Sequence, residues 1–210
     1  MSALNDINNY SNDISSEDIF CEKYYAFAAS IYWNNKNNDK LESSDKIVLP
    51  QSALRKLQKS ISQNNPIIFE IANDSDILPK KSHCSVIEFT ANDGCCYLPI
   101  QLMNNLGLDY HGNDIIKLSN VSLPKGKLVQ VQAHKTSEIL NLSTLIPKHI
   151  LEKSLTKYSS LTLGDTIQID YKQNIYKFDI TKVKPEIIKS TAPPAINIIE
   201  CDIEIDFKQP

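Results

Sequence analysis

Val48-Leu49-Pro50 is the first of three copies of one short phrase; the others are Tyr97-Leu98-Pro99 and Leu145-Ile146-Pro147. The prolines are evenly spaced along the 210 residues, with 99 − 50 = 49 and 147 − 99 = 48. Each phrase closes an apolar stretch and opens an amphipathic one, which is typical of a strand running into a helix with proline near its first turn. Because self-similarity at a fixed interval indicates repeated structural units, the sequence predicts three strand and helix units.

The first two units share a plan in which a helix separates two apolar strands. In the first unit we expect strands at 46–49 and 66–71 around a helix at 52–60. In the second we expect strands at 85–89, 96–98 and 115–118, with a helix that carries Leu102, Met103 and Leu106. Asp93-Gly94, between the first two of these strands, is a strong hairpin signal.

The third unit has a helix with Ile150, Leu151 and Leu155, followed by a strand at 166–169 and a hairpin around 172–174. Before the first unit, Tyr25 to Ile31 resembles a strand, and the polar stretch Asn34 to Asp45 is expected to be an exposed loop. The segment Val121 to Thr136, with a strand at 128–131, is the expected bridge between subdomains.

These elements predict a mainly β architecture with a few short helices. Two repeat units can interleave into one closed barrel, while the third lies beside it. The expected divisions are a disordered tail at 1–18, a barrel at 19–121 and a mixed α/β subdomain at 122–210.

Composition restricts the classes of function. The 22 basic and 25 acidic residues give a formal charge of −3, so no global field attracts nucleic acid or anionic lipid. Residues 1–18 lack the features of a secretory signal, and no apolar run approaches the length of a membrane span, which predicts a cytoplasmic and nuclear protein without membrane insertion. The odd number of cysteines, five, suits reduced thiols better than a disulfide framework.

Motifs for catalysis, metal or cofactor binding are missing from the sequence. Five scattered glycines cannot form a phosphate-binding loop, and GxSxG and HExxH do not occur. His83-Cys84 is the only His/Cys neighbour pair, and its two side chains would point to opposite faces of a strand. Cys95 and Cys96 are the best candidate nucleophiles, but without an identifiable base they fit core or edge thiols better.

An alternating pattern near the end of the sequence supplies the one candidate binding surface. Four acidic residues alternate with four apolar ones, which predicts a strand with one apolar and one acidic face: Glu200, Cys201, Asp202, Ile203, Glu204, Ile205, Asp206 and Phe207. One interpretation is a solvated outer face. The other is an acidic strip that selects a basic partner by complementary charge.

Four segments also carry a resemblance to a known family. They are Ile47 to Leu54, His83 to Phe89, Gly94 to Pro99 and Ile198 to Phe207. Together they resemble, in the same order and from about Phe20 to Pro210, the N-terminal domain of the ubiquitin fusion degradation protein 1 family. Leu161 to Ile167 and Asn174-Ile175-Tyr176 are similar to that family's second subdomain. Two positions depart from the family pattern: Ser85 replaces a usual glycine and Gln101 a common aromatic.

The resemblance implies a double-psi β-barrel followed by a smaller mixed α/β subdomain. It also implies a non-catalytic adaptor, without cofactor, that binds ubiquitin and polyubiquitin. With the nuclear protein localisation 4 protein, such an adaptor delivers ubiquitylated clients to the AAA ATPase valosin-containing protein, and those two partners would bind through segments beyond Pro210. On this hypothesis we expect Glu200, Asp202 and Glu204 to contact ubiquitin, whose recognition face is an apolar patch with a basic rim.

Two other classes stay open at this point. Double-psi barrels also host decarboxylases and proteases, so an enzyme on the same scaffold is the first alternative. A self-processing pyruvoyl enzyme would need a Gly-Ser pair, which the sequence lacks. The second alternative is an interaction domain that never touches ubiquitin.

Overall fold

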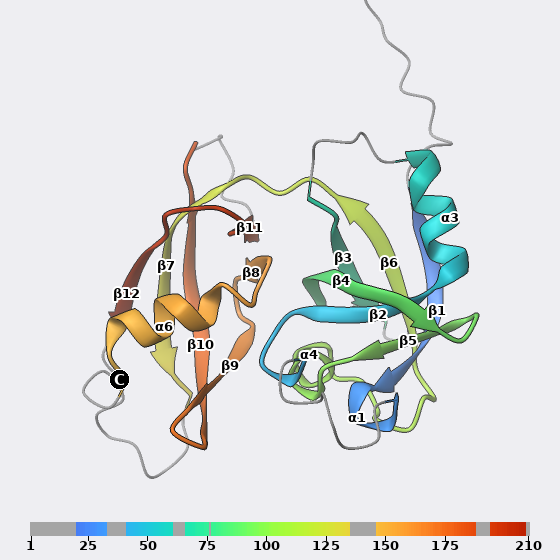
Figure 1. Cartoon of the computed structure of the whole chain (residues 1–210), viewed down its shortest axis with the longest axis horizontal. Coiled ribbons are helices and arrows are strands. Elements are labelled where there is room, and N and C mark those ends of the chain that lie inside the picture. Colours follow the sequence, from blue (N-terminus) through green and yellow to red (C-terminus); the bar gives the residue numbers. More distant parts are fainter. Residues whose placement is uncertain are drawn as a thin grey trace, which may run out of the picture.

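Two β-rich subdomains lie side by side in the computed structural model, with the N-terminal one on the right of Figure 1. The structure describes residues 20–32, 41–60, 66–75, 77–134, 146–187 and 194–208. The predicted tail at 1–18 lies outside these residues. Between the subdomains, the first ends with a strand at Val121 and the second begins its first strand at Gly126. The expected architecture, mainly β with short helices and two subdomains, is confirmed.

Six strands of the first subdomain close into a barrel. They are β1 (Cys21–Ala28), β2 (Lys46–Pro50), β3 (Ile68–Asn73), β4 (Lys81–Ala91), β5 (Cys95–Leu98) and β6 (Ile115–Val121), arranged in the order β1-β5-β2-β4-β3-β6. Inward-facing aliphatic and aromatic side chains such as Ile47, Leu49, Phe69 and Leu98 fill it and are fully buried. The first two repeated phrases meet inside this barrel, because Val48 of β2 is the register partner of Tyr97 of β5.

The sequence predicted a hairpin between β4 and β5. The turn is present, but the two strands do not pair with each other. Gly94 adopts a positive φ of 79° and Cys95 N–H donates to the Asn92 carbonyl, so the chain does reverse there. However, β2 lies between β4 and β5, parallel to β4 and antiparallel to β5. In the same way β1 lies between β5 and β6. These two insertions give the double-psi arrangement, which local turn chemistry alone does not reveal.

All three repeated prolines lie immediately before a helix. The helices are α3 (Gln51–Ser60), α4 (Ile100–Leu106) and α6 (Lys148–Leu155). Pro99 and Pro147 have nearly identical backbone angles, φ −57° with ψ 142° and 141°. The prediction of helix starts at the phrases is therefore confirmed. A fourth helix, α1 (Ala29–Tyr32), ends the predicted strand at 25–31 earlier than expected.

The second subdomain contains an open sheet. Its strands β7 (Gly126–Ala133), β9 (Thr166–Tyr171), β10 (Asn174–Pro185) and β12 (Glu204–Lys208) follow the order β12-β7-β10-β9, and α6 packs against β9. A two-stranded sheet pairs β8 (Ser160–Thr162) with β11 (Ala195–Asn197). The predicted hairpin after β9 is confirmed: Lys172 and Gln173 both have positive φ, 50° and 64°, as a twist-matched two-residue turn requires.

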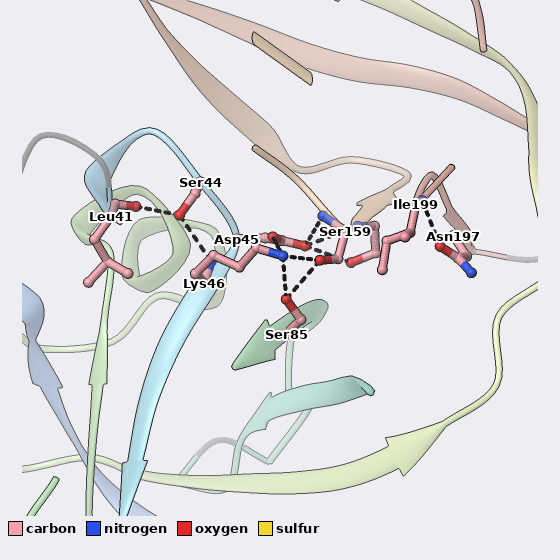
Figure 2. A network of polar contacts seen from close by, with 9 residues as sticks. Leu41, Ser44, Asp45, Lys46, Ser85, Ser159, Asn197 and Ile199 are labelled. Atoms are coloured by element: carbon pink, nitrogen blue, oxygen red, sulfur yellow. Dashed lines mark hydrogen bonds and ion pairs between the residues drawn. The ribbon is translucent and has the colours of Figure 1, made fainter. Parts of the chain in front are cut away.

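The contact between the subdomains is largely polar, and it corrects the prediction of an exposed loop at 34–45. Residues 33–40 lie outside the description, but Leu41, Ser43, Ser44 and Asp45 are all buried. Asp45 accepts a hydrogen bond from the backbone N–H of Ser159 in the second subdomain (Figure 2). It accepts another from the backbone N–H of Ser160. Burying these polar groups is tolerated because they bind one another across the interface.

Candidate binding groove on the second subdomain

Two adjoining hollows form a groove between the end of α6 and the segment 198–204. The first has a volume of about 500 Å³ and is lined by Glu152, Leu155, Thr156, Ile198, Cys201, Asp202, Ile203 and Glu204. The second has a volume of about 430 Å³ and is lined by Lys46, Thr156, Tyr158, Ser159, Ile198, Ile199, Glu200, Cys201 and Asp202. Both hollows are bordered by Thr156, Ile198, Cys201 and Asp202. We therefore treat the two hollows as one site and call it the acidic groove.

The chain around Ile198 and Glu200 is fixed by hydrogen bonds of its backbone. Ile198 N–H donates to the Ser159 carbonyl at 2.9 Å, and the Asn197 side chain accepts from Ile199 N–H at 2.9 Å, as Figure 2 shows for the second pair. Glu200 then takes a positive φ of 53°, which turns the chain toward β12. Since Ser159 N–H in turn donates to Asp45, this wall of the acidic groove is connected to the interface between the subdomains.

The three carboxylates predicted to bind a partner are brought to this groove, although the predicted strand is shorter than expected. Glu200 lies in a turn and β12 begins only at Glu204, because the turn at Glu200 interrupts the extended backbone. The alternation of faces nevertheless holds where it was expected: Ile203 and Ile205 pack on the subdomain core, and Asp202 and Glu204 are exposed. Asp202 borders both hollows, Glu200 one and Glu204 the other.

The fourth acidic residue of the strip has a different role. Asp206 of β12 accepts a hydrogen bond of 2.7 Å from the Gln130 side chain on the neighbouring β7. Among the described residues, no side chain forms a hydrogen bond or ion pair with the carboxylates of Glu200, Asp202 or Glu204. Three exposed negative charges thus remain available beside an apolar floor.

Helix α6 contributes two residues to the groove that the sequence did not assign to a binding surface. Glu152 belongs to α6, where it lies 4.0 Å from Lys148 in an exposed i, i+4 pair, and it adds a fourth carboxylate to the rim. Leu155, three residues further along α6, contributes to the buried floor. Helical spacing places Glu152 and Leu155 on neighbouring parts of one helix face, but only the folded chain shows that this face meets Ile198 and Ile203.

The barrel contributes Lys46 at the other end of the groove. Its ammonium donates hydrogen bonds to Ser85 and Ser159 and lies 3.6 Å from the Asp45 carboxylate (Figure 2). The Ser85 and Ser159 hydroxyls are 2.7 Å apart. Burial raises the pKa of Asp45, while Lys46 and the hydrogen bonds from Ser159 and Ser160 oppose that shift.

This lysine and serine cluster bears on the alternative of an enzyme. A lysine beside two serines is a grouping that can activate a nucleophile. Here Ser159 is completely buried and Ser85 is 5% exposed, so neither hydroxyl is open to a substrate. The cluster is built to join β2 and β4 of the barrel to the residue that precedes β8.

His83 and Cys84 lie on opposite faces of β4, as the sequence predicted. Cys84 and Cys96 are buried in the barrel core, and burial raises the pKa of both thiols. His83 points away from Cys84 and lies 3.0 Å from the Thr162 hydroxyl of the second subdomain. Within the described ranges, no group of three or more His, Cys, Asp and Glu side chains could hold a metal ion. None of the helices in those ranges is long and apolar enough to cross a membrane.

Comparison with protein families finds two matches that together extend over the described fold. Residues 20–124 match the family described as ubiquitin fusion degradation protein UFD1, N-terminal subdomain 1. Residues 125–210 match the family described as N-terminal subdomain 2 of the same protein.

Similar proteins occur in several organisms. The "Ubiquitin fusion degradation protein 1 homolog" of Dictyostelium discoideum is 40% identical over 189 residues, which is 90% of this chain and 52% of that protein. The human "Ubiquitin recognition factor in ER-associated degradation protein 1" is 32% identical over 191 residues, 91% of this chain and 57% of the relative. The Saccharomyces cerevisiae "Ubiquitin fusion degradation protein 1" is 33% identical over 179 residues, 82% of this chain and 46% of the relative. The chain thus spans about half the length of these curated relatives.

Proposed function

The chain belongs to the ubiquitin fusion degradation protein 1 family, and from this premise we propose that it is a non-catalytic ubiquitin-binding module that acts in ubiquitin-dependent protein degradation. The names of its relatives refer to ubiquitin fusion degradation, and to ubiquitin recognition in ER-associated degradation. The acidic groove supports this proposal at particular residues, because exposed carboxylates there border an apolar floor.

The groove and the recognition face of ubiquitin are complementary in two respects. The partly exposed Ile198 and Ile203, which lie over the buried Leu155, offer apolar area. Negative charge at the edge comes from Glu200, Asp202 and Glu204. Ubiquitin presents an apolar patch surrounded by basic side chains. Apolar contact supplies most of the favourable free energy in such an interface, while the charges fix orientation and accelerate association.

A single contact of this size is expected to be weak. Exposed ion pairs contribute only about 0.2–1 kcal/mol each, and the groove is open to solvent. A polyubiquitin chain raises the effective concentration of each further ubiquitin, so a chain binds more tightly than a single ubiquitin without any new type of contact. The module would therefore favour clients that carry several ubiquitins.

The direct test is an NMR titration of isotope-labelled ubiquitin with this chain, followed by the reverse titration. We expect shifts on the apolar patch of ubiquitin and, in the reverse experiment, at Cys201 to Glu204 and at the end of α6. The double variant Asp202→Asn with Glu204→Gln should weaken binding by roughly 2- to 30-fold, from the loss of two exposed charge contacts.

The matched control neutralises two carboxylates outside the groove, Glu88→Gln on β4 and Glu186→Gln just after β10. It should bind ubiquitin as the wild type does. Unchanged spectra at millimolar ubiquitin would contradict ubiquitin binding itself. Binding that both double variants retain equally would contradict the groove as its place.

We propose that the module works in the cytoplasm and nucleus with the nuclear protein localisation 4 protein and the AAA ATPase valosin-containing protein. Pull-down with each partner tests the two interactions. It uses residues 1–210 and a version extended to the full length of the relatives. Capture by the extended version alone would place the contact outside residues 1–210, and capture by neither would contradict it.

A further inference from the structure

A small cavity at the interface between the subdomains is lined by two residues that each carry a buried oxygen atom without a hydrogen-bond donor. The cavity has a volume of about 20 Å³, and its walls include Asp45 and Gln101 from the first subdomain and Ser160, Thr162 and Thr166 from the second. Asp45 Oδ1 and Gln101 Oε1 are both buried, and no described residue donates a hydrogen bond to either. Asp45 is 5% exposed and Gln101 7%.

The orientation of the Gln101 amide follows from its neighbours. Asn105 donates through Nδ2 to the Thr166 carbonyl at 3.0 Å and accepts through Oδ1 from Thr166 N–H at 3.2 Å. These two backbone groups allow only one orientation of the Asn105 amide. Gln101 must therefore direct its Nε2 donor at Asn105 Oδ1, 3.1 Å away, and its Oε1 acceptor lies on the other side. A rotation of the Gln101 amide would oppose two acceptors, so the unpartnered oxygen is not an ambiguity of the amide.

Asp45 also has one oxygen atom that lacks a hydrogen-bond donor. Its Oδ2 accepts three hydrogen bonds, from Ser159 N–H, Ser160 N–H and the Ser160 hydroxyl. Its Oδ1 has only the Lys46 ammonium nearby, at 3.6 Å, which is beyond hydrogen-bond distance. A buried acceptor without a donor costs about 1–3 kcal/mol, so the ligand that fits here is a small donor.

We propose that this cavity is a binding site for a single water molecule that donates one hydrogen bond to Asp45 Oδ1 and one to Gln101 Oε1. A water needs roughly 10–15 Å³ of such space and two to four polar partners. The cavity volume of about 20 Å³ meets the first condition, and the two unpartnered oxygens would supply the second. A metal cation fits less well because the Lys46 ammonium already balances the Asp45 carboxylate. The water joins the interface network that also positions Lys46 at the end of the acidic groove.

A crystal structure of the wild-type protein at about 1.5 Å resolution tests the site directly. We expect a density peak about 2.6–3.2 Å from both oxygens. An empty cavity, at a resolution where other internal waters are ordered, would overturn the proposal. Contacts of about 2.0–2.6 Å to several oxygens would indicate a hard cation instead and would also overturn it.

A measurement in solution uses the variant Gln101→Met, which preserves side-chain length and removes the acceptor. Oxygen-17 relaxation dispersion of water reports long-lived internal waters and is not affected by exchange of protein hydroxyl protons. We expect the amplitude to fall by the contribution of one water in this variant and to stay unchanged in Gln132→Met, a control on β7 that does not line the cavity. Equal amplitudes in the wild type and Gln101→Met would overturn the proposal.

Discussion

The Asp45 carboxylate of the barrel accepts a hydrogen bond of 2.8 Å from the backbone N–H of Ser159 in the second subdomain, 114 residues further along the chain. The same carboxylate oxygen also binds Ser160 N–H at 3.0 Å. A buried side chain of the first subdomain thus accepts hydrogen bonds from backbone N–H groups at the start of β8. The contact is one of several hydrogen bonds between the subdomains, together with those of His83 with Thr162 and of Ser82 with Asp165.

The first prediction concerns the removal of that carboxylate. Asp45→Ala leaves the N–H groups of Ser159 and Ser160 without an acceptor and leaves Lys46 without its counter-charge. Breaking one partner of a buried charged network typically costs about 3–5 kcal/mol, and we expect a loss of that order in the free energy of unfolding. Urea denaturation measures it. The exposed Glu186→Ala should change stability by less than ~0.5 kcal/mol, and a loss below ~1 kcal/mol for Asp45→Ala would contradict this role.

The second prediction is a pH dependence that arises from Asp165. Burial raises the pKa of Asp165 from its ordinary value of 3.8 to about 7, although hydrogen bonds from Ser82 and Thr162 oppose the shift. The folded protein therefore keeps this proton between about pH 4 and 7 while the unfolded chain releases it, so the contribution of Asp165 to stability decreases as pH rises through that window. The free energy of unfolding of Asp165→Asn minus that of the wild type should therefore rise with pH, by up to about 1.4 kcal/mol per pH unit. A constant difference would contradict the shift.

The third prediction concerns His83, which acts in the opposite direction. Burial lowers the pKa of His83 from 6.5 to about 4, so the unfolded chain takes up the proton first on acidification and stability falls as pH decreases from 6.5 to 4. Stability of His83→Gln relative to wild type should therefore decrease as pH rises through this window. Because His83 and Asp165 oppose each other there, each effect shows clearly only in the single variants. Denaturation curves at pH 4.5, 5.5 and 6.5 measure both, and parallel pH profiles for wild type and His83→Gln would reject this one.

The fourth prediction compares two glycines with similar backbone angles. Gly112 has φ 82°, and a Cβ there would lie 2.1 Å from Cε1 of the Phe27 ring. Gly94 has φ 79° with nothing within 4 Å of such a Cβ. Gly94→Ala should cost about 1–2 kcal/mol from backbone strain alone, and Gly112→Ala about 1–3 kcal/mol more because the ring must move. Thermal unfolding of the two variants tests this, since equal melting temperatures would show that Phe27 yields freely.

The strands and helices of this fold were largely predictable from local patterns, and their pairing was not. The three Leu-Pro or Ile-Pro phrases marked helix starts because proline fits the beginning of a helix, and alternation marked the strands. The β4 to β5 turn at Asp93-Gly94 suggested a local hairpin. The insertion of β2 between those strands depends on contacts 49 residues apart, from Val48 to Tyr97, which no local pattern encodes.

The groove shows the same limit. Alternation identified Asp202 and Glu204 as exposed, and burial follows that pattern. Glu152 and Lys46 were missed because they reach the groove from a helix and from the other subdomain. Asp45 was assigned to an exposed polar loop because aspartate and serine usually face water. Its partners are backbone N–H groups, which every sequence contains, so composition gives no signal for such a contact.

The position of β2 has a consequence for how fast the chain folds. The link between β4 and β5 is short and consists of Asn92, Asp93 and Gly94. The two strands nevertheless cannot form a local hairpin early in folding, because β2 must occupy the space between them. The barrel closes only after distant residues have paired, from Val48 with Tyr97, 49 positions apart, to Cys21 with Ser119, 98 positions apart. The loop entropy of that search is lost before any strand contact compensates it. We therefore expect refolding on the scale of milliseconds to seconds, as for other domains dominated by distant contacts. In this chain, the speed of folding is a property of its strand order.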